Sequence, residues 1–449
     1  MVDEMGDPRR VPRADPGARR IAGGRPEVAR RPQELAGDRR SSQEIAGDRR
    51  RGPRAAARSG ACDAPDAGLA TDRGARRRDA GSIPAMIPLA RPALGDREVD
   101  AVAAVLRSGM LVQGPLVERF EALLAERCAR RFGVAVSSGT AALQLTFRAL
   151  GVGREDAVVV PALTWPSPAH AAAELGARVR LVDVDPAEWN APPEAYAKHA
   201  DAAAAVVIDQ FGNPARPPHF EGPVVEDAAC ALGSLLASGR PCGSLGVASC
   251  FSFHPRKILT TGEGGAILTD DEGLAEELRS LRNHGLEGPG RFRRPAANHR
   301  LTEMQGALGV EQMGRLDDLL ARRHTHAVAL RDALEGHVEL QVAAEGARPN
   351  HQTLGAILPE GVDRDTFLER LRELGVQGGR LSYALHRLHT LPRPDESLEV
   401  TERVVDRGVA LPLFPSMSEA ERRTVADAVR STIDTLRGGS DATQGGASG

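Results

Sequence analysis

The sequence predicts an α/β fold with a mostly parallel central sheet, because short apolar runs alternate with segments long enough to form helices. The runs lie at 157–161, 179–183, 204–208 and 223–227. This alternation is typical of parallel strands joined by crossover helices, and ligands of such folds bind at the carboxyl ends of the strands. Trp165 follows the first run, Asp227 closes the last, and Lys257 lies just beyond a further run at 247–253.

Apolar residues at helical spacing predict the flanking helices. One helix begins near Asp96 and ends at Ser108 and Gly109, and a second surrounds Phe120. A strand at 132–136 meets a turn of small residues and then an amphipathic helix. Thr302 is placed to cap a long helix that carries the chain into a smaller C-terminal α/β domain.

Four segments are therefore predicted: an arginine-rich extension (1–85), a large domain (86–326), a small domain (327–437) and a flexible tail (438–449). The extension has 19 Arg, 13 acidic residues, a net charge of +6 and few large apolar side chains, so we expect it to be disordered. Its interleaved acids and lack of aromatic residues argue against nucleic-acid binding. We expect translation to begin at Met86.

The overall composition, 41% hydrophobic and 27% charged with a net charge of −3, has no apolar run long enough to cross a bilayer. Five cysteines show no C-x-x-C pair and no zinc or iron–sulfur spacing. A cytoplasmic protein without a metal site is expected.

Lys257 stands out because only two of the 58 basic residues are lysines. Arginine stays protonated, whereas a partly buried lysine amine can lose its proton and form a Schiff base with an aldehyde. A lysine retained for no chemical reason is the alternative, and it suits Lys198, which lies in a polar, alanine-rich stretch.

Three features together predict pyridoxal 5′-phosphate (PLP) as the cofactor. Lys257 suits its aldehyde, Asp227 suits its ring nitrogen, and the turn containing Gly139 and Thr140 suits its phosphate, because helix N-termini and small residues bind anions. Trp165 offers a flat face for the ring. Taken singly, the turn is also an ordinary helix start, Asp227 an ordinary cap and Trp165 an ordinary core residue.

The residues from Ile87 to about Arg437 resemble the DegT/DnrJ/EryC1/StrS family, the sugar aminotransferases of the fold-type I PLP enzymes. The resemblance rests on ordered motifs at 87–92, 108–115, 137–143, 161–165, 182–185, 211–214, 226–229, 252–265, 283–285 and 298–305. It implies Lys257 as the Schiff-base lysine, Asp227 as the partner of the ring nitrogen and Trp165 as the stacking aromatic. It also implies phosphate contacts from Gly139, Thr140 and Ser252, and from Asn298 of a neighbouring subunit, hence a homodimer with shared sites.

Two departures from the family pattern stand out. Cys230 replaces the usual glutamine or histidine near the cofactor's phenolic oxygen, so that contact is expected to be weaker or made by water. The segment 212–226 is short and proline-rich, so we expect a loop where the family has a helix.

The expected activity is transfer of an amino group from glutamate or glutamine to a keto-sugar nucleotide. The alternatives are a PLP-dependent sugar dehydratase, although such relatives carry histidine at the lysine position, and a PLP-binding regulator or inactive partner subunit. The sugar, the ketone position and the product stereochemistry are expected to depend on the loops 285–294 and 381–386. The side chains of these loops do not by themselves reveal the ligand.

Overall fold

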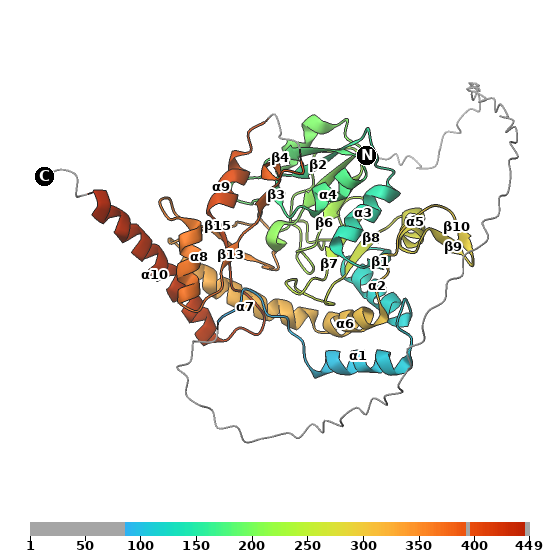
Figure 1. Cartoon of the computed structure of the whole chain (residues 1–449), viewed down its shortest axis with the longest axis horizontal. Helices are drawn as coiled ribbons and strands as arrows, with labels where there is room; N and C mark the ends of the chain where they lie inside the picture. Colours follow the sequence, from blue (N-terminus) through green and yellow to red (C-terminus); the bar gives the residue numbers. More distant parts are fainter. Residues whose placement is uncertain (1–85, 392–395, 445–449) are drawn as a thin grey trace, which may run out of the picture. The chain divides into compact units, whose positions relative to one another are not determined.

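The computed structural model describes residues 86–391 and 396–444 (Figure 1). The expectations for residues 1–85 lie outside this range. A seven-stranded sheet in the order β1-β8-β7-β6-β5-β2-β4 forms the centre. Only β8 runs antiparallel to its neighbours, so the predicted α/β class with a mostly parallel sheet is confirmed. The strands are β1 (Phe132–Val136), β2 (Ala157–Pro161), β4 (Arg178–Val182), β5 (Ala204–Ile208), β6 (Val224–Asp227), β7 (Ala248–Ser252) and β8 (Gly265–Thr269).

Helices cover both faces of this sheet. Helices α3 (Gly139–Ala149), α4 (Ser167–Glu174) and α5 (Glu272–Arg282) pack on one face, and α2 (Pro115–Arg127) packs on the other. Along β2, Val158 and Val160 belong to the core on the α3, α4 and α5 face, whereas Ala157 and Val159 belong to the core on the α2 face. Side chains of a strand alternate between faces, so a strand buried on both sides is apolar at every position.

The helix ends follow the predicted caps. Helix α1 (Asp96–Ser108) ends at Gly109, whose φ of 71° is left-handed. Thr302 and Gln305 form a capping box at the start of α6 (Glu303–Met313). The single long helix expected after Thr302 is two helices, because α6 ends at Gly314 and α7 (Leu316–Leu334) follows.

A second, four-stranded antiparallel sheet lies in the C-terminal part, in the order β11 (Glu339–Leu340), β12 (Leu354–Ile357), β15 (Gly408–Leu411), β13 (Gly379–Arg380). Its core includes residues of α7, α8 (Arg364–Glu373) and α10 (Glu419–Gln444). Helix α10 continues past Gly438, where a tail was expected, because each further residue of a formed helix adds a hydrogen bond. The boundary expected at 326/327 falls inside α7 and stays a prediction.

Short elements connect the two sheets. Strand β3 (Leu163–Thr164) pairs with β14 (Tyr383–Ala384), close to α9 (Glu399–Arg407). The expected loop 285–294 contains a hairpin of β9 (Leu286–Gly288) and β10 (Arg291–Phe292) instead. Three short 3-10 helices are η1 (Pro193–His199), η2 (Gln210–Gly212) and η3 (Leu385–Arg387). Residues 213–223 form neither helix nor strand, as the proline-rich departure predicted.

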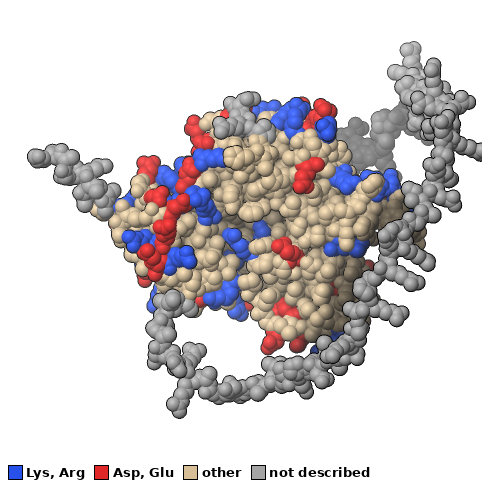
Figure 2. All heavy atoms as spheres, viewed as in Figure 1, with Lys and Arg blue, Asp and Glu red and all other residues tan. Residues whose placement is uncertain are grey.

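Charged side chains are interspersed over the face shown in Figure 2, where basic and acidic residues lie next to one another. Among the described residues, no helix is both long enough and apolar enough to span a membrane.

Candidate active site

The predicted site residues come from strand ends at one edge of the large sheet. Asp227 is the last residue of β6 and Ser252 the last of β7, and these two strands pair in parallel with Asp227 opposite Cys250. Lys257 lies in the bend that follows β7. The parallel topology therefore brings these side chains to a common edge.

The Lys257 amine faces the turn that follows Asp227. The backbone N–H of Lys257 donates to the His254 carbonyl at 2.8 Å, which fixes the bend. The side chain is half-buried, and Nζ donates to Cys230 Sγ at 3.0 Å. The cysteine that departs from the family pattern is thus a direct neighbour of the lysine.

Asp227 is 7% exposed and lacks a full set of donors. Its Oδ1 accepts the Ala229 N–H at 3.1 Å, and Oδ2 has no donor in the described part of the chain. Burial raises the pKa of Asp227, while the Ala229 N–H and the Lys257 charge act in the opposite direction. A cationic N–H placed against Oδ2 would stabilise the carboxylate, as a protonated pyridine nitrogen does.

The turn before α3 lies directly on the end of β7. The Ser138 side chain accepts the Ala141 N–H as the N-cap, which leaves the N–H groups of Gly139 and Thr140 without an intrahelical acceptor. A Cβ on Gly139 would lie 2.8 Å from Ser252 Cβ, so only glycine fits there. Thr140 Oγ1 lies 2.7 Å from Ser167 Oγ. Free N–H groups, hydroxyls and the helix dipole together suit a phosphate.

Trp165 is an accessible aromatic face rather than a core residue. Its side chain is 61% exposed and meets the Tyr383 ring edge-to-face, with centroids 5.3 Å apart and planes at 79°. Pairing of β3 with β14 places Tyr383 opposite Thr164. The core alternative for Trp165 is therefore wrong, and the other tryptophan, Trp189, is the fully buried one.

Asn298 is exposed and does not contact the other predicted residues. Its Oδ1 accepts the Arg300 N–H at 3.2 Å, and its backbone pairs with Asn283. The role implied for Asn298 lies in a neighbouring subunit, so it stays a prediction.

Asn350 is a supporting residue that sequence reasoning missed. Its Nδ2 donates to the carbonyls of Cys230 at 2.9 Å and Leu232 at 3.0 Å, which holds the turn after Asp227. A Cβ on Gly212 would lie 1.9 Å from Asn350 Oδ1, so glycine is required at that position too. No local pattern marks Asn350, because its partners lie about 120 positions earlier in the chain.

A buried acid pair lies behind Asp227. Glu226 accepts the N–H groups of Gly243 and Leu245, both at 2.8 Å, and the Ser249 hydroxyl at 2.7 Å. Asp209 is fully buried, and among the described residues no hydrogen bond of ordinary geometry reaches its Oδ2. Burial and the Glu226 charge raise the pKa of Asp209 well above its usual value. Burial next to Glu226 therefore disfavours a second carboxylate charge behind the site.

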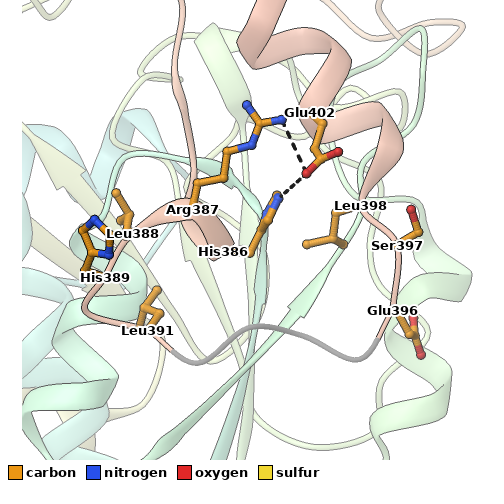
Figure 3. A pocket seen from close by; sticks show the side chains of 9 residues that line it. All are labelled: His386, Arg387, Leu388, His389, Leu391, Glu396, Ser397, Leu398 and Glu402. Carbon is orange, nitrogen blue, oxygen red and sulfur yellow. Dashed lines mark hydrogen bonds and ion pairs between the residues drawn. The ribbon is translucent and has the colours of Figure 1, made fainter.

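A cavity of about 640 Å³ lies where the chain continues beyond β14 (Figure 3). His386 Nε2 and the guanidinium of Arg387 both approach Glu402 Oε1, at 2.9 and 3.4 Å. His386 ends the segment 381–386 that was expected to select the substrate.

Comparison with known families decides the assignment. The model of the DegT/DnrJ/EryC1/StrS aminotransferase family matches residues 92–430. The chain belongs to this family. The residues that carried the sequence resemblance are thus those of a DegT/DnrJ/EryC1/StrS aminotransferase, and the fold is that of the fold-type I PLP aminotransferases.

Three solved DegT-like structures illustrate the range of similarity. TlmJ, an aminotransferase from Streptoalloteichus hindustanus, is 30% identical, with a TM-score of 0.73 over 78% of this chain and 100% of its own. Spr1654 of Streptococcus pneumoniae, described as a sugar aminotransferase and solved in its PMP form, is 23% identical, with a TM-score of 0.75 over 79% and 100%. A variant of the GDP-4-keto-6-deoxymannose-3-dehydratase ColD with bound GDP-perosamine is 23% identical, with a TM-score of 0.71 over 76% and 100%.

Proposed function

We propose that this aminotransferase uses PLP to move an amino group from glutamate or glutamine to a keto-sugar nucleotide, in amino-sugar biosynthesis. The observation that carries the proposal is the meeting of Lys257, Asp227 and the Gly139 turn at one edge of the sheet. These groups match the aldehyde, ring nitrogen and phosphate of PLP one for one.

Different groups of the site would bind different parts of the cofactor. The N–H groups of Gly139 and Thr140, with the Ser252 hydroxyl, would bind the phosphate. Asp227 Oδ2, which accepts no hydrogen bond in the described part of the chain, would hold the ring nitrogen in its protonated form. Trp165 would cover one face of the ring and shield it from water.

Lys257 has two tasks in this proposal. When bound, PLP supplies an aldehyde that condenses with amines and a ring that accepts the electron pair released when a Cα–H bond breaks. Lys257 would hold the cofactor through its amine and would move the Cα proton as a general acid and base. Cys230 Sγ accepts a hydrogen bond from Nζ at 3.0 Å and would orient the amine when it is free.

The first test uses the two lysines of the chain as a matched pair. Purified wild-type protein should show the visible absorption band of lysine-bound PLP, and glutamate should bleach it. Lys257→Ala should lack the band, whereas Lys198→Ala, which alters an exposed ion pair with Glu396, should keep it. A Lys257→Ala protein that retains the band would refute the proposed role of the lysine.

The acceptor is tested separately. The protein is incubated with glutamate or glutamine and a panel of keto-sugar nucleotides, and product formation is read by mass. A mass change corresponding to replacement of a ketone by an amine supports the proposal. Loss of a hydroxyl without gain of nitrogen would favour the dehydratase alternative, which the fold likeness to ColD motivates. No product from any substrate would favour the regulator alternative.

A homodimer is part of the same proposal, and an exposed apolar face supports it. Helix α1 packs against α6, yet Val99 and Leu106 are 65% and 56% exposed, and Met110, Leu111 and Val112 just beyond it are exposed too. An apolar surface of this kind is typical of an interface. Val99→Glu with Leu106→Glu should halve the mass measured by analytical ultracentrifugation; a wild-type protein that sediments as a monomer would refute the dimer.

A further inference from the structure

A second cavity lies apart from the PLP-binding residues. It has a volume of about 590 Å³ and is bounded by α7, the segment 341–355, and Phe211 and Asn213. None of Lys257, Asp227 and Cys230 lines it. Its size falls within the range of small-molecule sites, so it can hold a ligand of its own.

Two arginines without acidic partners face this cavity. Arg331 of α7 is half-buried and Arg348 is exposed, and in the described part of the chain neither guanidinium donates a hydrogen bond or forms a salt bridge. Asp332 is the one carboxylate among the lining residues. Elsewhere on α7, by contrast, Arg322 pairs with Asp318 at 3.0 Å. Two arginines outnumber the one lining carboxylate, Asp332, whose charge acts on Arg331, so the cavity has a net positive charge.

Two histidines complete the polar wall. His324 Nδ1 lies 3.3 Å from His351 Nε2. His351 has a φ of 54°, an unfavourable conformation for a residue with a side chain, and such strain persists where the surrounding structure imposes it. Burial, with the nearby charges of His324, Arg331 and Arg323, lowers the pKa of His351 to about 4.

We propose that this cavity binds a small phosphate-bearing anion. The guanidinium fork matches phosphate oxygens with two parallel hydrogen bonds, and the His324–His351 pair can add an N–H donor. The other lining residues include three polar ones, Asn213, Gln341 and Thr353, and several apolar ones: Phe211, Val328, Ala343, Ala347, Pro349 and Leu354. Apolar side chains in the lining favour an organic phosphate over the free ion.

The position of the cavity relates it to the active site. His351 lies between Asn350, which holds the Cys230 carbonyl, and Gln352, which donates to the carbonyl of Arg256, the residue before Lys257. Arg323 fixes this segment by donating to the carbonyls of His351 and Gln352 at 3.2 and 3.1 Å. An anion bound at His351 thus contacts the segment that supports the catalytic lysine, which makes the cavity a candidate regulatory site.

The test is calorimetric titration of the PLP-loaded protein, whose cofactor phosphate site is filled, with inorganic phosphate and with glucose 1-phosphate. Wild type should bind at least one of them saturably. Arg331→Gln and Arg348→Gln should each weaken binding about tenfold or more, since each removes charge-assisted hydrogen bonds. Arg322→Gln, the matched control on α7, should bind as wild type does.

The two probes and the variants decide between outcomes. Tighter binding of glucose 1-phosphate identifies an organic phosphate as the ligand class, whereas equal binding identifies the free phosphate group. Absence of saturable binding to wild type overturns the proposal. Unchanged binding in both arginine variants overturns it as well, because the anion then lies at the substrate site. Arg348 is exposed, so Arg348→Gln remains a valid test even if Arg331→Gln is poorly folded. Because binding is read without turnover, this result is independent of the proposed aminotransfer.

Discussion

Gly139→Ala is the sharpest test of the phosphate cradle, because the added methyl group has nowhere to go. Its Cβ would lie 2.8 Å from Ser252 Cβ and 3.3 Å from both the Phe251 carbonyl oxygen and Ser252 Oγ. Carbon atoms pack at about 3.5–4.0 Å, so the start of α3 must retreat from β7 by roughly 0.7 Å or more. That retreat separates the Gly139 and Thr140 N–H groups from the Ser252 hydroxyl.

The expected magnitude follows from the hydrogen bonds that this shift lengthens. A hydrogen bond to a charged group contributes about 1.5–3 kcal/mol, so loss of one phosphate contact weakens PLP binding roughly ten- to a hundredfold. Overpacking should also destabilise the fold by about 1–3 kcal/mol. The variant should therefore fold, bind PLP weakly and be rescued in part by a high PLP concentration.

The assay is a titration of the cofactor-free protein with PLP, followed by tryptophan fluorescence. The chain has only two tryptophans, and the exposed Trp165 is the one placed to be quenched by PLP. Gly153→Ala is the matched control, because a Cβ there meets nothing closer than Asp156 Oδ2 at 4.0 Å. Thermal unfolding of both variants separates lost affinity from lost stability.

Unchanged PLP affinity in Gly139→Ala, at unchanged stability, would refute the cradle at the start of α3. An equal loss of affinity in Gly153→Ala would show that glycine replacement, rather than contact with Ser252, is responsible.

Three further predictions concern other parts of the molecule. Asp209→Asn should flatten the pH dependence of stability. The pKa of Asp209 is raised in the fold, so the folded protein keeps a proton that the unfolded chain loses above about pH 4. The stability of the wild-type protein should therefore fall as the pH rises. Urea unfolding at about pH 5 and pH 8 measures this, and an equally steep decline in the variant would contradict it. Glu303→Gln should lower the free energy of unfolding by about 1–3 kcal/mol, because Glu303 accepts hydrogen bonds from three backbone N–H groups around the start of α2. The control Glu126→Gln changes an exposed residue and should leave the stability unchanged. Equal losses of stability in urea unfolding would count against the role of Glu303 at the start of α2. Trp165→Ala should weaken PLP binding about two- to tenfold and Trp165→Phe should not, since an aromatic contact contributes about 0.5–1.5 kcal/mol. Both variants lack the Trp165 fluorescence, so PLP binding is followed by the visible absorption band of lysine-bound PLP; equal affinity of the two would argue against stacking.

Local patterns in the sequence predicted most of the elements, and they pointed to residues suited to a cofactor site. The runs ending at Pro161 and Asp227 are apolar at nearly every position because their strands are buried on both faces. Gly109 and Thr302 marked helix ends through their own backbone and side-chain chemistry. The sequence patterns missed the break at Gly314 between α6 and α7.

The sequence by itself determined the fold class, the family and the residues suited to PLP, because each depends on residue type and on spacing along the chain. Only the tertiary structure decided which groups meet. It placed Cys230 against Lys257, brought Asn350 to the turn after Asp227 and gathered Arg331 with Arg348 around one cavity. Such contacts join segments far apart in the chain, and they arise from the packing of whole elements, which no short stretch of sequence encodes.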